Sequence, residues 1–247
     1  MNNDTEQKVA IITGASRGIG QKIAEQLSKL GIFTIINYRT NKEEAQKVVK
    51  NITNNGGKAI AIQADISKII DLEKLFDETI RICGKVDILI NNAGIMSNNT
   101  ILDVTEEEFD KHFSINVKGT YFSCQQAMEK MEENGRIINF STSVTGVMFP
   151  AYSVYAASKG AVDQLTRQLA KEFGIKGITI NAIAPGSVKT ELFLHEKSLE
   201  QIESMSKMNA FNRLGETGDI ADVIELLISN KSHWITGQTI KVNGGFI

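Results

Sequence analysis

The residues best suited to chemistry in this chain are Tyr155 and Lys159, which stand four positions apart. Residues with this spacing share one face of a helix. A phenol with an ordinary pKa of about 10 is a poor proton carrier at neutral pH, and a nearby ammonium group stabilises the phenolate and lowers that pKa. The pair therefore predicts a tyrosine that acts as an acid or a base on a substrate.

A second pair, Tyr38 and Lys42, has the same spacing, so the spacing alone is weak evidence. Tyr155 differs because three consecutive hydroxyl residues, Ser141 to Ser143, precede it at the end of an apolar β-rich run. Tyr38 has no such group upstream and falls at the end of an early strand. We therefore expect the reaction at Tyr155.

A second chemical feature is the turn T-G-A-S-R-G-I-G at 13–20. Its glycines let backbone approach a pyrophosphate, and the free N–H groups of the helix that follows favour an anion. The spacing GxxxGxG, with no Gly-Lys-Ser/Thr after it, excludes a P-loop for nucleoside triphosphates. A tight turn without a ligand is the alternative interpretation.

Apolar β-rich runs alternate with segments of helical period, which is typical of βαβ units. We expect strands at 8–13, 32–37, 58–63, 86–90, 136–140, 178–182 and 238–242. We expect helices at 18–30, 41–55, 67–83, 106–133, 152–173 and 217–229. The pattern predicts one α/β domain over 1–247, a Rossmann-type doubly wound parallel sheet of about seven strands in three αβα layers. Only residues 185–215 lack a strand, and we expect a substrate loop there.

Composition excludes several classes of protein. The chain has 27 Lys and Arg against 29 Asp and Glu, so it offers no basic field to nucleic acid. The N-terminus is polar, so we expect no signal peptide for export. No uncharged apolar run approaches 18 residues, so we expect no membrane-spanning helix. Two cysteines cannot make a disulfide framework, and the three histidines have no metal-ligand spacing. We expect a cytoplasmic protein without a metal.

The glycine turn and four later motifs occur in the order found in the short-chain dehydrogenase/reductase family, which this chain resembles from Lys8 to Gly245. The later motifs are N-N-A-G at 91–94, Asn116, the Tyr155–Lys159 pair and Pro185-Gly186. The resemblance implies an oxidoreductase that moves a hydride between a nicotinamide cofactor and a carbonyl or secondary alcohol, and a homo-oligomer, either tetramer or dimer.

The same resemblance implies a catalytic set. Tyr155 delivers the proton, Lys159 tunes it and binds the nicotinamide ribose, and Asn116 holds a water that refills the proton. A hydroxyl donates a hydrogen bond to the substrate oxygen. Counting from the strand start selects Thr142, whereas counting back from the following glycine selects Ser143; we expect Ser143 and keep Thr142 as the alternative.

Cofactor contacts also follow from the resemblance. The expected cofactor-binding residues are Gly14, Ser16, Arg17, Gly18, Ile19, Gly20, Tyr38, Arg39, Asp65, Ile66, Asn92, Ala93, Gly94, Tyr155, Lys159, Pro185, Gly186, Val188 and Thr190. An acid at the end of the second strand usually holds a free ribose 2′-hydroxyl, and here N-Y-R-T at 37–40 has none before Glu43. Arg17 and Arg39 can flank a 2′-phosphate, so we expect NADP(H) rather than NAD(H).

The substrate is expected to be a small or medium carbonyl compound or alcohol. Apolar residues available for its pocket are Met96, Phe149, Leu192, Phe193, Met205, Met208 and Phe211, helped by Phe246 and Ile247 of a neighbouring subunit. A 3-oxoacyl-carrier-protein reductase is an alternative, although I-M-S-N-N at 95–99 lacks the arginine common there and E-K-M-E-E at 129–133 is acidic. Epimerisation or dehydration, or a non-catalytic NADP(H)-binding redox sensor, are further alternatives.

Overall fold

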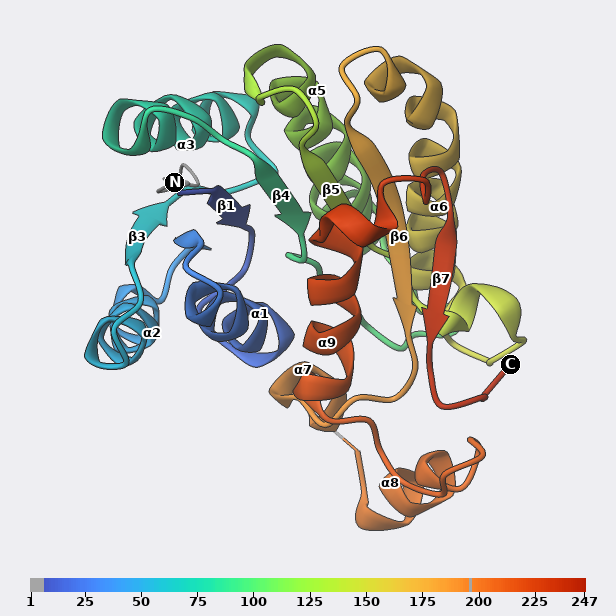
Figure 1. The fold of residues 1–247 in the computed structure, drawn as a ribbon. Helices are drawn as coiled ribbons and strands as arrows, with labels where there is room; N and C mark the ends of the chain where they lie inside the picture. Colours follow the sequence, from blue (N-terminus) through green and yellow to red (C-terminus); the bar gives the residue numbers. More distant parts are fainter. Residues whose placement is uncertain (1–6, 196) are drawn as a thin grey trace.

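The computed structural model describes residues 7–195 and 197–247, and a parallel sheet runs through its centre (Figure 1). Seven strands lie in the order β3-β2-β1-β4-β5-β6-β7, and every pairing is parallel. Their bounds are β1 (Val9–Ile12), β2 (Phe33–Tyr38), β3 (Ala59–Gln63), β4 (Ile88–Asn91), β5 (Arg136–Phe140), β6 (Thr179–Pro185) and β7 (Thr239–Val242). The predicted seven-stranded Rossmann-type sheet is confirmed.

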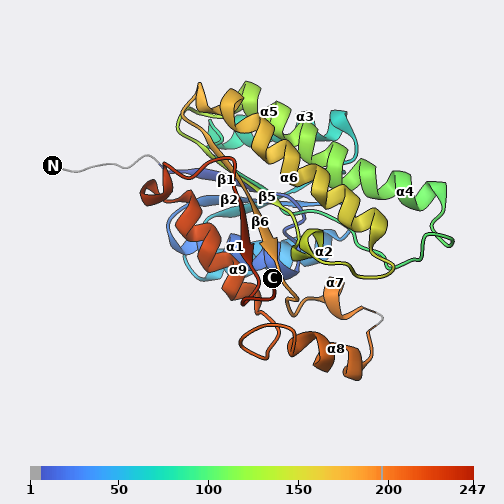
Figure 2. The same cartoon turned by 90° about the vertical axis from the view of Figure 1, so that its right-hand side faces the viewer.

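Helices cover both faces of the sheet, as Figure 2 shows. One face carries α1 (Gly18–Lys29), α2 (Lys42–Asn54) and α9 (Thr217–Ile228). The other carries α3 (Ile69–Cys83), α5 (Thr120–Lys130) and α6 (Ser153–Gly174). Within the described ranges, no helix is both long enough and apolar enough to cross a membrane.

Strand β1 explains why the strands read as continuous apolar runs. Alternate residues of a strand point to opposite faces of a sheet. Ala10 and Ile12 belong to the core under α1, α2 and α9, whereas Val9 and Ile11 belong to the core under α3, α5 and α6. All four are buried because helices cover both faces.

The expected helix at 106–133 is interrupted. The chain forms α4 (Glu106–His112), then a π-helical segment over Phe113–Gly119, and then α5. A Cβ on Gly119 would lie 2.9 Å from the Ile66 side chain, so only glycine allows the segment this close to the loop after β3. π-Helical segments occur frequently at functional sites, and Asn116 lies in the middle of this one.

Strand β6 is longer than predicted and ends on a proline. Its pairing with β5 stops at Ile183, while Pro185 still pairs with Val242 of β7. Because proline lacks an N–H, it is tolerated at a strand end where one neighbour has already left the ladder.

The segment from 189 to 214, called loop 189–214 below, joins β6 to α9 and holds α7 (Glu191–Leu194) and α8 (Leu199–Ser206). Its two ends meet beside the sheet. The Lys189 N–H donates to the Gly215 carbonyl at 2.8 Å, and the Gly215 N–H donates to the Ser187 carbonyl at 2.9 Å. The loop is therefore closed at its base.

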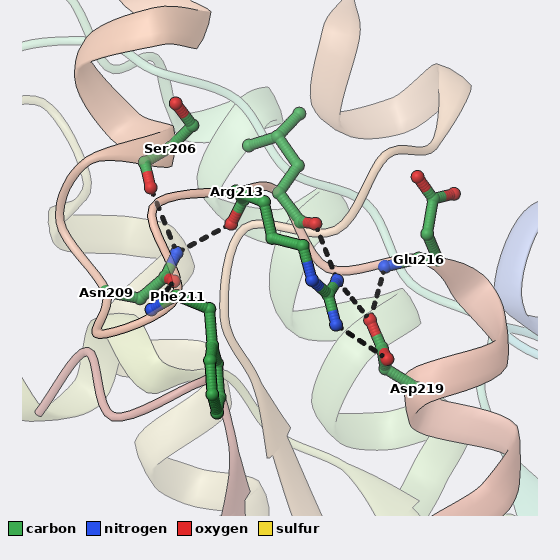
Figure 3. A network of polar contacts seen from close by, with 7 residues as sticks. Ser206, Asn209, Phe211, Arg213, Glu216 and Asp219 are labelled. Atoms are coloured by element: carbon green, nitrogen blue, oxygen red, sulfur yellow. Dashed lines mark hydrogen bonds and ion pairs between the residues drawn. The ribbon is translucent and has the colours of Figure 1, made fainter.

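A polar network fixes the returning end of this loop, as Figure 3 shows. Arg213 makes a two-point contact with the Asp219 carboxylate, at 2.7 and 3.0 Å, and Asp219 also accepts from the Glu216 N–H. The Asn209 amide donates to the carbonyls of Ser206 and Arg213. The loop is thereby joined to the first turn of α9.

The core under α3 generates a prediction for stability. Phe76 is fully buried there, and Phe76→Ala should lower the free energy of unfolding by about 3 to 5 kcal/mol. Ile70 lies on the same helix with 55% of its surface exposed, and Ile70→Ala should cost less than about 0.5 kcal/mol. Urea unfolding followed by circular dichroism measures both; equal losses would contradict this account of the core.

Candidate active site

The glycine turn lies where β1 passes into α1. Gly14 and Gly18 have φ of +63° and +59°, in the left-handed region that favours glycine. A Cβ on Gly20 would lie 2.5 Å from the Asn92 amide nitrogen, so Gly20 permits close packing of the helix. Helix α1 begins without a side-chain hydrogen bond from Arg17 at its N-cap, which leaves its first N–H groups available to an anion.

Side-chain amides hold this turn in place. The Asn92 amide donates to the carbonyls of Thr13 and Gly14, at 2.9 and 3.1 Å. The Ala93 N–H donates to the Thr13 hydroxyl at 3.0 Å. The Gly14 N–H donates to the Asn37 side chain at 3.3 Å. The ends of β1, β2 and β4 are therefore linked at the glycine turn.

A groove of about 600 Å³ runs over the turn. The expected cofactor residues on its walls are Gly14, Ser16, Arg17, Gly18, Ile19, Tyr38, Arg39, Asp65, Ile66, Asn92, Ala93, Gly94 and Thr190. Tyr155, Lys159, Pro185, Gly186 and Val188 line the adjoining pocket instead. Of the expected cofactor set, Gly20 alone lies on neither wall.

Two charged groups on the groove wall have protein partners. Arg17 forms an ion pair with Glu191 of α7 at 2.9 Å, and both side chains are more than 60% exposed, so solvent weakens the pair. Asp65 accepts hydrogen bonds from the N–H and the hydroxyl of Ser67. The carboxylate of Asp65 therefore stabilises the turn that leads into α3.

An apolar pocket of about 150 Å³ opens beside the groove. Five of the seven apolar residues expected there lie on its wall: Met96, Phe149, Leu192, Phe193 and Met205. Met208 and Phe211 do not; Phe211 is 70% exposed and lines a separate cavity. The pocket and the groove meet, because Ile19, Asn92, Gly94, Ile95, Thr190 and Leu192 line both.

The carboxyl-terminal residues differ from the expectation. Phe246 of the same chain lines the pocket, so a neighbouring subunit is not needed to place it there. Its ring lies 5.9 Å from that of Phe149. After β7 the chain bends at Gly244 and Gly245, both with positive φ, and returns to its own pocket.

Tyr155 and Lys159 both lie on α6, where Tyr155 is partly buried and Lys159 is buried. Burial raises the pKa of Tyr155 to about 12, and a hydrogen bond with the Thr142 side chain opposes that rise. Burial lowers the pKa of Lys159 to about 8. The pKa of Tyr155 is therefore raised rather than lowered in this structure, because burial is the largest effect on it. The Lys159 ammonium donates to the Phe140 carbonyl at 2.7 Å. At neutral pH the phenol is protonated.

The two candidate hydroxyls have different surroundings. Thr142 interacts with the Tyr155 phenol, and its oxygen also accepts from the Val144 N–H. The Ser143 hydroxyl donates to the Ala184 carbonyl at 3.0 Å and accepts from the Asn243 amide at 3.0 Å. Both hydroxyls therefore have partners within the protein, and of the two it is Thr142 that contacts the Tyr155 phenol.

Asn116 connects the π-helical segment to its surroundings. Its amide exchanges hydrogen bonds with the N–H and carbonyl of Ile95 and donates to the Ser158 hydroxyl. A Cβ on Gly94 would lie 3.2 Å from the Asn116 side-chain oxygen and 3.3 Å from the Lys159 nitrogen. Gly94 therefore lies between the two groups, and a side chain at this position would crowd both of them.

The sequence prediction overlooked Tyr152, which lines the pocket one helical turn before Tyr155. Tyr152 stands three residues before Tyr155, a spacing that places both on one face of a helix, but it matched no expected motif. His112 is buried, and its ring contacts the Glu108 carbonyl and the Ser97 hydroxyl. Within the described ranges, no group of three or more His, Cys, Asp or Glu side chains is placed to hold a metal ion.

Comparison with known proteins identifies the family. A family model described as enoyl-(acyl carrier protein) reductase matches residues 14–247. Short-chain dehydrogenase/reductase GME11373 of Pestalotiopsis microspora is 39% identical, over 96% of this chain and 94% of that protein. The chain belongs to the short-chain dehydrogenase/reductase family. The resemblance predicted from the sequence motifs is confirmed, and the protein is an oxidoreductase of that family.

Other members are similar over nearly their whole length. Versicolorin reductase 1 of Aspergillus parasiticus is 41% identical, over 99% of this chain and 98% of that protein. The angucycline C-6 ketoreductase LanV, whose crystal structure has NADP bound, is 36% identical in sequence. Its structure matches with a TM-score of 0.92 over 97% of this chain and 95% of that chain. The groove, the pocket and Tyr155 therefore lie in the fold that this family shares.

The buried Lys159 of this family member generates a prediction for pH dependence. Its pKa is lower in the folded protein, at about 8, than its ordinary value of 10.5. Between these values the unfolded chain holds a proton that the folded protein has lost, so stability rises with pH. From pH 7 to 10, the unfolding free energy of the wild type should rise by roughly 2 to 3 kcal/mol relative to Lys159→Met.

Urea unfolding of both proteins at several pH values tests this difference. Tyr155 is present in both proteins, so its titration largely cancels. Curves that stay parallel from pH 7 to 10 would show that Lys159 is not destabilised by burial.

Proposed function

We propose that the protein reduces a small or medium ketone to a secondary alcohol with NADPH and catalyses the reverse oxidation with NADP⁺. The observation that carries the proposal is the position of Tyr155. Its protonated phenol lies on the wall of the apolar pocket that adjoins the glycine-lined groove, beside the hydroxyl of Thr142 and one helical turn from Lys159.

The residues of the groove fit a dinucleotide phosphate. The start of α1 offers N–H groups without a side-chain cap, and Gly14 and Gly18 leave the adjoining backbone accessible. Arg17 and Arg39 line the groove, and no acid follows β2 before Glu43, which favours a 2′-phosphate over a free hydroxyl. NADP in the similar LanV structure supports the same cofactor. When bound, the nicotinamide supplies or accepts the hydride.

Tyr155 donates its phenolic proton to the carbonyl oxygen of the ketone. The Thr142 hydroxyl donates a hydrogen bond to the same oxygen and stabilises the charge that develops there. Lys159, buried one turn away, stabilises the phenolate left behind. Ser143 instead fixes the ends of β6 and β7, through Ala184 and Asn243. Asn116 positions the loop after β4 beside Lys159.

The small, aromatic-lined pocket favours a modest apolar ketone over a long acyl chain. Similarity to proteins named versicolorin reductase and angucycline ketoreductase supports a ketone on a ring system. The description of the matching family model supports the alternative, a carrier-protein thioester. A panel of cyclic ketones and 3-oxoacyl thioesters, followed by NADPH absorbance, separates them. NADPH binding without turnover of any member would favour a redox sensor.

The catalytic set generates a prediction about two hydroxyls. Tyr155→Phe should lower kcat by at least about 10³-fold and leave NADPH binding nearly unchanged. Thr142→Val should lower kcat by about 10² to 10³-fold, because it removes a hydrogen bond to the developing oxyanion. Ser143→Ala should mainly lower stability. A larger kcat loss in Ser143→Ala than in Thr142→Val would assign the hydroxyl to Ser143.

Cofactor choice generates a separate prediction. Arg39→Ala should lower kcat/KM with NADPH by about 10 to 100-fold and change it less than about threefold with NADH, because only NADPH carries the phosphate. Arg81→Ala, on the exposed surface of α3, is the matched control and should change neither value. Equal losses with both cofactors in Arg39→Ala would exclude a phosphate contact.

A further inference from the structure

One wall of the pocket is a row of aromatic rings. Phe246 lies 5.9 Å from Phe149, Phe149 lies 5.7 Å from Tyr152, and Tyr152 lies 6.4 Å from Tyr155, measured between ring centroids. All four line the pocket. The row therefore begins at the proposed proton donor and presents aromatic surface to any flat ring bound beside it.

Tyr152 contributes a second phenol to this wall. It is partly buried, and burial raises the pKa of its phenol above the ordinary value. A hydrogen bond with Asn98 offsets part of that rise. A phenol can accept one hydrogen bond through its oxygen and donate another through its O–H. Tyr152 can therefore bind a second polar group in the pocket while it contacts Asn98.

Asn98 is fixed in the loop that follows β4. The Glu108 carboxylate accepts hydrogen bonds from the Ser97 hydroxyl and, at 2.7 Å, from the Asn99 amide. These contacts hold the residues on either side of Asn98 to α4. His112, buried beneath them, contacts Ser97 as well. The loop around Asn98 is therefore tied to α4 by side-chain hydrogen bonds on both sides of that residue.

We propose that Tyr152, held by Asn98, is a second hydrogen-bonding residue of the pocket and makes it selective for flat cyclic ketones that carry another oxygen on the ring system. The proposal rests on the proposed ketone reduction. The aromatic row binds the flat ring, Tyr155 protonates the reacting oxygen, and Tyr152 binds the second oxygen. A ketone that lacks this oxygen leaves the partly buried Tyr152 hydroxyl without its partner.

The experiment compares 1-tetralone with its 5-, 6- and 7-hydroxy derivatives as ketone substrates, with NADPH at saturation. The wild type should favour at least one hydroxylated isomer over 1-tetralone by about tenfold in kcat/KM. Tyr152→Phe should reduce that preference to about twofold or less, mainly by raising KM for the hydroxylated ketone. Asn98→Ala should reduce the preference in the same direction.

Tyr121→Phe is the matched control, because Tyr121 is a partly exposed tyrosine of α5 that lines neither cavity. It should keep the wild-type preference. Reduction of all four ketones at similar kcat/KM by the wild type, or an unchanged preference in Tyr152→Phe, would overturn this proposal and leave ketone reduction standing. NADPH binding with no turnover of any ketone in the wider panel would overturn the proposed function and the selectivity with it.

Discussion

Backbone groups at the carboxyl edge of a parallel sheet lose their strand partners, and here side-chain amides replace them. An amide can donate and accept at once, which a carboxylate cannot do at neutral pH. Asn37 donates to the Ala64 carbonyl and accepts from the Gly14 N–H. Asn92 bridges β4 to the glycine turn, and Asn116 pairs with both backbone groups of Ile95. The groove has a fixed floor because these amides satisfy the groups on which it is built.

Near the same edge, Tyr155 and Lys159 lie in surroundings that disfavour both the tyrosine phenolate and the lysine ammonium. Lys159 has a backbone carbonyl as its hydrogen-bond partner rather than a carboxylate, and Tyr155 has a neutral hydroxyl. Their pKa values move in opposite directions for one reason, since burial disfavours the ionised form of each group. The structure therefore places a lysine with a pKa of about 8 one helical turn from a tyrosine that keeps its proton at neutral pH. In the proposed reaction, that proton passes to the substrate oxygen.

Much of this arrangement could be predicted from the sequence, and the exceptions have physical causes. Strands buried on both faces read as unbroken apolar runs, so the sheet was predictable. The π-helical segment at 113–119 was not, because one extra residue in a turn hardly alters an apolar pattern. The choice between Thr142 and Ser143 depends on how the backbone leaves β5, which residue counting does not determine. The pKa of Tyr155 depends on burial, and burial is a property of the folded chain.

Loop 189–214 has its two ends joined by hydrogen bonds at Gly215, so it starts and finishes at nearly the same place on the sheet. Its length and sequence can therefore vary without moving Tyr155 or the glycine turn, which are held by other elements. The loop is in this respect an exchangeable module. Transplanting the equivalent stretch from a relative would renew one side of the pocket while the side that carries Tyr155, on α6, keeps its place.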